Sequence, residues 1–104
     1  MVRLAPSARQ DLRDLLAGWK EAGGDTDALS KRILKTADTL QRRPGIGHRL
    51  PDVTALPLHF FPTIDEIMIV YQREPFRILF FIPPWVELAG ALRRRVAQAQ
   101  RSRP

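Results

Sequence analysis

The feature that most constrains the fold of this chain is a change in hydrophobic periodicity at Pro44. Before that proline, apolar residues recur at the three- and four-residue intervals of a helical face. After residue 55, the chain contains short runs rich in β-branched and aromatic residues, which are typical of strands. Because two helical segments precede several strand-like segments, the sequence predicts a single α+β domain.

The first segment predicts a short strand followed by a helix. Residues 2–5, VRLA, alternate in the manner of a strand, which Pro6 closes. Ser7 stands three residues before Gln10, which is the spacing of a capping box, so we expect the helix to begin there. The apolar stripe of this helix, which we expect to be buried, comprises Leu12, Leu15, Leu16 and Trp19.

A second helix is expected after the glycine pair at 23–24, because glycine readily adopts the left-handed conformation that ends the first helix. Asp25 or Thr26 can cap the second helix. Pro44 ends it, because proline disfavours helical geometry in the residue before it. The short connection predicts an antiparallel helical hairpin. The expected buried side of its second helix comprises Leu29, Ile33, Ala37 and Leu40.

Three strand-like runs follow, at residues 56–61, 67–73 and 76–82. The short connections between them predict two hairpins and therefore an antiparallel meander. Together with residues 2–5 they give the order β-α-α-β-β-β. We expect the helical hairpin to pack on a mainly antiparallel four-stranded sheet.

The chain after the last strand predicts a closing helix and a tail. Pro83 and Pro84 end the strand, and residues 85–100 can form a short C-terminal helix. We place one domain at residues 1–96 and a basic, flexible tail at residues 97–104.

The glycine-rich stretch PGIG at residues 44–47 raises the question of a phosphate-binding loop. Such a loop follows a strand and opens a helix. Here a helix precedes the glycines and a strand follows them, and the lysine and hydroxyl residue of a phosphate loop are absent. We therefore interpret residues 44–47 as a turn that ends the helical hairpin.

Composition limits the classes of function. Seventeen Lys and Arg residues against eleven Asp and Glu give a net charge of +6, which attracts nucleic acid or an acidic protein. The chain has no cysteine, so disulfides, zinc–cysteine sites and cysteine nucleophiles are excluded. No apolar run approaches the roughly 18 residues of a membrane span. The first residues lack the apolar centre of a signal peptide, so we expect a cytoplasmic protein.

Four stretches, taken in order, resemble the RelE/ParE superfamily of bacterial toxins. They are LAPSARQDL (4–12), RRPGIGHRLP (42–51), IMIVYQ (67–72) and RILFFI (77–82). The resemblance covers residues 2–96. It implies the growth-inhibiting toxin of a type II toxin–antitoxin (plasmid stabilisation) system, neutralised in a hetero-oligomer by a cognate acidic antitoxin. RelE-type members of this superfamily cleave mRNA on the ribosome, whereas ParE-type members inhibit DNA gyrase by binding it.

The residues after the last strand bear on the choice between these branches. Metal-free RNA cleavage needs a proton acceptor, a proton donor and positive charge near the phosphate. The RelE-like nucleases that this chain resembles usually have polar or basic residues directly after the last strand. At these positions this chain has Pro83, Pro84 and Trp85, whose side chains transfer no proton. We therefore favour a ParE-like protein that is not an enzyme and uses no cofactor or metal.

Two alternatives stay open. A metal-independent, ribosome-dependent endoribonuclease would require its candidate catalytic residues to converge on one face of the sheet; these are His59, Glu66, Arg73 and Arg77. A toxin-fold adaptor without activity would bind only its antitoxin or DNA.

Exposed basic residues and one tryptophan are the candidate partner-binding residues. Trp85 follows two prolines, and tryptophan is a frequent hot spot of protein interfaces, although it could equally cap the core. The arginine-rich end of the chain could contact phosphates or the antitoxin. The full set is Arg32, Lys35, Trp85, Arg93, Arg94 and Arg95.

Overall fold

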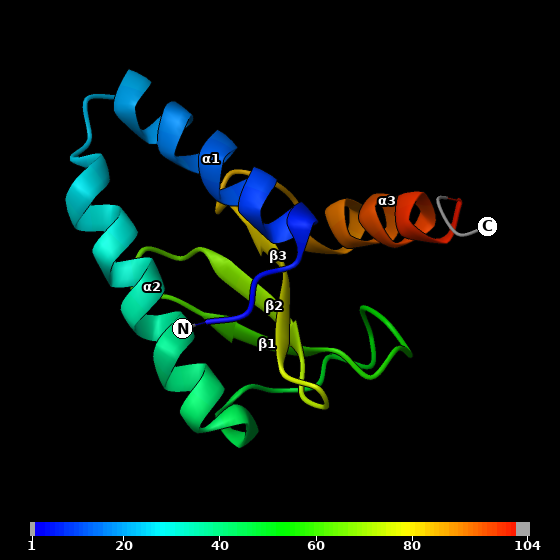
Figure 1. Cartoon of the computed structure of the whole chain (residues 1–104). Helices are drawn as coiled ribbons and strands as arrows, with labels where there is room; N and C mark the ends of the chain where they lie inside the picture. The colour runs from blue at the N-terminus through cyan, green and yellow to red at the C-terminus, as the bar shows by residue number, and fades with distance from the viewer. Residues whose placement is uncertain (1, 102–104) are drawn as a thin grey trace.

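The computed structural model describes residues 2–101 and the side chains of residues 2–97 (Figure 1). It confirms the α+β class. The first half of the chain forms α1 (Pro6–Glu21), α2 (Thr26–Arg42) and a 3₁₀ turn, η1 (Pro44–Ile46). The second half forms β1 (His59–Pro62), β2 (Met68–Gln72), β3 (Arg77–Ile82) and α3 (Leu88–Arg101).

The three strands form an antiparallel sheet in the order β1-β2-β3, so the predicted meander is confirmed. Strand β3 contains one irregularity. Val70 pairs with Phe80 while Tyr71 pairs with Ile78, which leaves Leu79 as the extra residue of a β-bulge. The bulge shifts the alternation of β3 by one residue, so Ile78 and Phe81 belong to one core while Leu79, Phe80 and Ile82 belong to the other.

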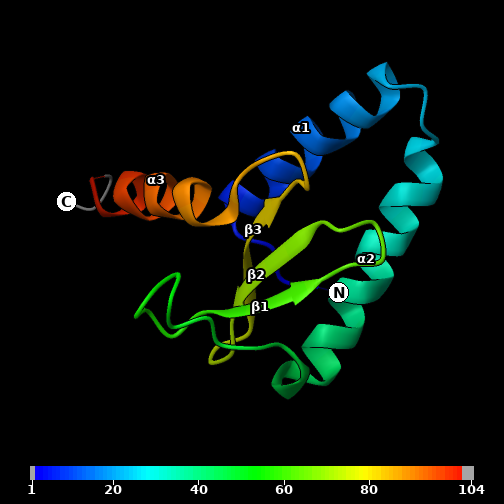
Figure 2. The ribbon, with the colours of Figure 1, turned by 180° about the vertical axis from the view of Figure 1, so that it is seen from behind.

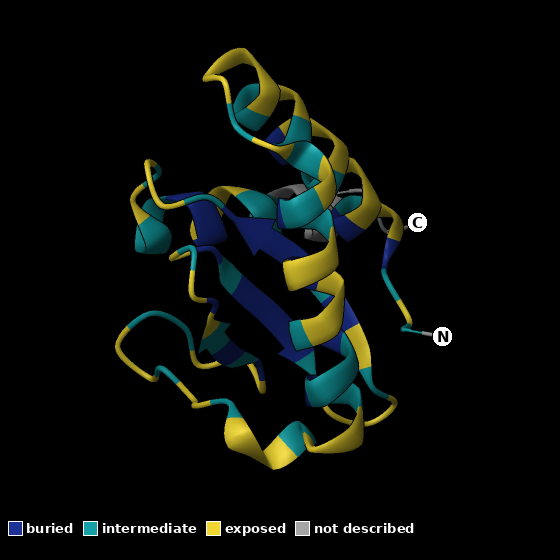
Figure 3. Cartoon of the chain, turned by 90° about the vertical axis from the view of Figure 1, so that its left-hand side faces the viewer, coloured by how far each residue is buried: buried dark blue, intermediate teal, exposed yellow. Residues whose placement is uncertain are grey.

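Helices cover the two faces of the sheet (Figures 1 and 2). On one face, α1 and α2 enclose a core that includes Ile69 and Phe81. On the other face, α3 and the loop after η1 cover a second core that includes Phe60 and Phe80. Figure 3 shows the strands largely buried and the outer sides of the helices exposed.

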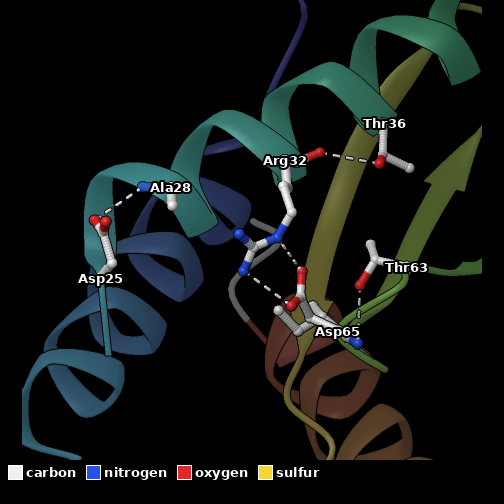
Figure 4. Close-up of polar contacts among 7 residues, drawn as sticks. Asp25, Ala28, Arg32, Thr36, Thr63 and Asp65 are labelled. Atoms are coloured by element: carbon white, nitrogen blue, oxygen red, sulfur yellow. Dashed lines mark hydrogen bonds and ion pairs between the residues drawn. The ribbon is translucent and has the colours of Figure 1, made fainter. Parts of the chain in front are cut away.

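Helix α2 begins and packs as the sequence predicts. The side chain of Asp25 accepts a hydrogen bond of 3.1 Å from the backbone N–H of Ala28 (Figure 4). The four residues of its predicted buried side are all completely inaccessible to solvent: Leu29, Ile33, Ala37 and Leu40.

The predicted fourth strand is wrong. Residues 2–5 make a single parallel bridge, between Leu4 and Ile78, at the outer edge of β3. Two backbone hydrogen bonds hold it, from Ala5 N–H to Ile78 O (2.8 Å) and from Ile78 N–H to Arg3 O (3.0 Å). Pairing ends there because α1 begins at Pro6.

The predicted capping box is also wrong. Ala5 is the N-cap of α1 and makes no side-chain cap. The hydroxyl of Ser7 instead donates to the carbonyl of Leu79 (2.7 Å), and one turn later the carboxylate of Asp11 accepts from the N–H of Phe81 (3.0 Å). Side chains of α1 thus make hydrogen bonds to backbone groups at the edge of β3, where another strand would otherwise pair.

The other edge of the sheet is covered as well. His48 and Phe60 exchange two backbone hydrogen bonds of 2.9 and 2.8 Å along β1. Pro62, two residues further on, has no N–H to offer a neighbouring chain. Little of either edge is open to pairing with a strand of another protein.

Helix α3 begins at Leu88, three residues later than predicted, and runs to Arg101. The carboxylate of Glu87 accepts from the N–H of Gly90 (2.7 Å), which fixes this start. Residues 102–104 of the predicted tail lie outside the described residues. None of the helices within residues 2–101 combines the length and apolar character needed to cross a membrane.

Candidate functional site

The turn at residues 44–47 is held by the hydroxyl of Tyr71. This hydroxyl donates to the carbonyl of Pro44 (2.7 Å) and accepts from the N–H of Gly47 (3.0 Å). Tyr71 itself is completely buried, and burial raises the pKa of its phenol. The turn therefore fixes the end of α2 against β2, in agreement with its interpretation as structural.

A pocket of about 430 Å³ lies beside this turn, at the start of β1 and the end of β2. Its lining comprises Pro57, His59, Gln72, Arg73 and Glu74. The ring centroids of His59 and Tyr71 are 5.5 Å apart. The Nδ1 atom of His59 is buried and has no hydrogen-bond partner among the described residues.

The surroundings of His59 favour the neutral form of its imidazole. Burial, and secondarily the positive charges of Arg73 and Arg49, lower the pKa of its imidazole below the ordinary 6.5. A neutral imidazole can accept a proton, and nearby guanidinium groups can hold an anion. Arg49 belongs to this set, although no local pattern in the sequence indicated it.

The structure brings together only part of the predicted catalytic set. Arg77 begins β3 and pairs with Gln72, so it lies at the same end of the sheet as His59, outside the pocket lining. Glu66 lies in the loop between β1 and β2, which follows the last residue of β1, Pro62. That is the opposite end of β1 from His59, three residues or about 10 Å along the strand.

A second hollow, of about 330 Å³, lies between α1, the end of β3 and the start of α3. We call it the α1–α3 cleft. Its lining comprises Asp11, Asp14, Leu15, Phe81, Ile82, Pro83, Trp85, Val86, Ala91, Arg94 and Arg95. Trp85 is 62% exposed at this cleft, so the indole is open to solvent rather than enclosed in the core.

The six predicted partner-binding residues do not share one surface. Arg32 makes a bidentate contact with Asp65, with both hydrogen bonds at 3.0 Å, and so ties α2 to the loop between β1 and β2 (Figure 4). The hydrogen bond to Asp65 raises the pKa of the Arg32 guanidinium. Lys35 is exposed on the same helix, on the side of the sheet away from α3.

The three arginines of α3 also differ from one another. Arg95 pairs with Asp11 (2.6 Å) and lies over the ring of Phe80, 4.6 Å from its centroid. Arg93 and Arg94 are exposed and make no ion pair within the described part of the chain. Only Arg94 combines a free charge with a place at the α1–α3 cleft.

Among residues 2–101, no three histidine, aspartate or glutamate side chains gather in a position to hold a metal ion. Comparison with known proteins gave no match, either to a protein-family model or to a curated protein sequence.

The environment of His59 leads to a first prediction. Because its pKa is lower in the folded protein, the folded state binds fewer protons than the unfolded state near and below pH 6.5. We expect the contribution of His59 to the free energy of unfolding to be constant above pH 6.5. It should fall as the pH decreases through the folded pKa.

Urea denaturation of the wild type and of His59→Gln, at several pH values between 5 and 8, measures this contribution. The stability difference between the two proteins should change in favour of the variant as the pH falls. A difference that stays constant across the range would contradict the lowered pKa.

Proposed function

We propose that this chain is the toxin of a type II toxin–antitoxin pair in the cytoplasm. It is neutralised in a hetero-oligomer by an acidic antitoxin, and it inhibits DNA gyrase by binding, without chemistry of its own. The α+β order, with a helical hairpin before an antiparallel meander, is compatible with the RelE/ParE resemblance.

The dispersal of the candidate catalytic groups is the observation that carries the non-enzymatic part of the proposal. Glu66 lies at the far end of β1 from His59, and the chain after β3 continues through Pro83 and Pro84. A proton donor and a proton acceptor must act on one phosphate within hydrogen-bond reach. The predicted set of four does not meet this requirement.

Charge supports a binding function. The chain carries a net charge of +6, and Lys35, Arg93 and Arg94 are exposed and make no ion pair among the described residues. The positive electrostatic potential of such a surface accelerates association with acidic proteins and slows association with basic proteins.

The His59 pocket favours a second candidate, a metal-independent endoribonuclease. A neutral His59 could accept the proton of a ribose 2′-hydroxyl while Arg73 and Arg49 hold the phosphate. The pocket also contains Glu74, and a carboxylate beside a phosphate opposes its binding. This reading therefore ranks second.

Pulse labelling of DNA and protein synthesis, minutes after induction of the chain without a partner, separates the candidates. We expect DNA synthesis to fall first, and His59→Gln to remain as toxic as the wild type. If protein synthesis falls first and His59→Gln restores growth, the endoribonuclease reading replaces the proposal. If neither synthesis falls, the chain is a toxin-fold adaptor and the proposed function is wrong.

A further inference from the structure

The α1–α3 cleft has the composition of a protein-binding site. Its floor consists of apolar side chains from three elements, among them Leu15 of α1, Phe81 of β3 and Ala91 of α3. Trp85 stands at the cleft with most of its surface exposed. An exposed indole beside an apolar hollow is typical of the anchoring points of protein interfaces.

Internal contacts leave one cation of this cleft available. The carboxylate of Asp11 is occupied by Arg95 (2.6 Å) and by the N–H of Phe81 (3.0 Å), so this ion pair presents little net charge. Asp14, on the α1 side, accepts a hydrogen bond of 2.8 Å from Gln10. Arg94, on the α3 side, is exposed and makes no ion pair with a carboxylate of the described residues.

We propose that the α1–α3 cleft binds a short acidic segment of a protein partner. An apolar side chain of that segment enters the cleft against Trp85, and a carboxylate of the segment pairs with Arg94. The inference rests on the proposed function, in which an acidic antitoxin is the partner, and it assigns the place where that partner docks.

The chemistry of the cleft selects this occupant over others. A nucleic acid would find an apolar floor that contributes nothing to phosphate binding. A second copy of this chain, itself at +6, would be repelled at long range. An acidic segment is attracted by that net charge and meets Arg94 at the rim of the cleft.

Helix α3 offers a matched control one residue away. Arg93 is exposed like Arg94, but it borders a different hollow, together with Val53, Leu92 and Val96. Arg93→Glu and Arg94→Glu therefore change the net charge equally. Only the second change places a negative charge at the α1–α3 cleft.

The test uses two synthetic helix-forming peptides of the same length and leucine pattern, one with glutamates and one with lysines at its polar positions. The indole N–H signals of Trp85 and Trp19 are followed by NMR in the full chain. We expect the glutamate peptide to shift the Trp85 signal and to leave that of Trp19 unchanged. Arg94→Glu should weaken binding by about tenfold, as expected for losing one charge-assisted contact, whereas Arg93→Glu should weaken it by no more than about threefold.

Equal binding of the two peptides, an unshifted Trp85 signal, or equal losses in the two arginine variants would each overturn the inference. Growth inhibition in cells is measured separately, with the wild-type chain. If the chain is toxic but the peptide does not bind at Trp85, only the docking site is wrong. If the peptide binds but the chain is not toxic, the proposed function is wrong and the docking site remains.

Discussion

Replacing Gly47 with alanine is expected to lower the free energy of unfolding by about 2–4 kcal/mol, because of overpacking and the loss of buried hydrogen bonds. The backbone of Gly47 is extended (φ −75°, ψ 165°), a conformation that alanine adopts without strain. The cost comes from contact, since a Cβ at this position would overlap the hydroxyl and ring edge of Tyr71. The buried tyrosine could move away only by giving up its hydrogen bonds to the turn.

The other glycine of the same turn, Gly45, provides the control for this prediction. A Cβ at Gly45 would meet only the guanidinium of Arg73, at an ordinary contact distance of 3.8 Å, so Gly45→Ala should change stability little. Urea denaturation of both variants measures the difference. Equal effects of the two substitutions would show that the contact with Tyr71 does not determine the cost.

Tyr71→Phe tests the same contact from the other side. It leaves the N–H of Gly47 and the carbonyl of Pro44 without their partner, which costs about 1–3 kcal/mol. Because Gly47→Ala acts partly through that hydroxyl, it should destabilise Tyr71→Phe less than it destabilises the wild type. Additive effects in the double variant would contradict a shared cause.

Removal of the Asp11 side chain is the second large expected effect. Asp11→Ala deprives Arg95 of its partner and leaves the N–H of Phe81, at the edge of β3, without an acceptor. Both side chains of the ion pair are largely buried, with 10% of Asp11 and 27% of Arg95 exposed. We expect a loss of about 2–4 kcal/mol, somewhat below that of a fully buried pair because solvent still reaches Arg95.

Two further variants separate the roles of this carboxylate. Asp11→Asn keeps one acceptor oxygen for the N–H of Phe81 but removes the charge and the second oxygen, which Arg95 uses, so its cost should be smaller than that of Asp11→Ala. Asp38→Ala breaks an exposed ion pair with Arg42 on α2 and should change stability by less than about 1 kcal/mol. Thermal and urea unfolding of all three variants tests this order. An effect of Asp38→Ala as large as that of Asp11→Ala would contradict it.

Local periodicity was sufficient to predict most of the secondary structure. The buried side of α2 and its Asp25 cap depend on residues within a few positions of one another, and the strand-like runs became β1, β2 and β3 within three residues. These features are readable because hydrophobic spacing and capping act over one or two helical turns.

The candidate site was predictable only in part. His59 and Arg73 were both recognised from the sequence, and the pairing of β1 with β2 places them in one pocket. Glu66 was grouped with them, because residue types alone do not show which end of a hairpin a side chain occupies. Arg49 was missed, because it comes from a long loop without periodicity.

The sequence by itself thus determined the class of the fold, the two helices of the hairpin, the antiparallel meander and the basic character of the surface. Only the tertiary structure decided how the edge of β3 is covered, because Ser7 and Asp11 find their partners at Leu79 and Phe81, some 70 residues away. The same long-range packing joins α1 and α3 around the cleft and leaves Trp85 exposed there. Neither the covered edge of β3 nor the α1–α3 cleft can be predicted from a local sequence pattern, because each depends on groups that meet only when distant segments fold together.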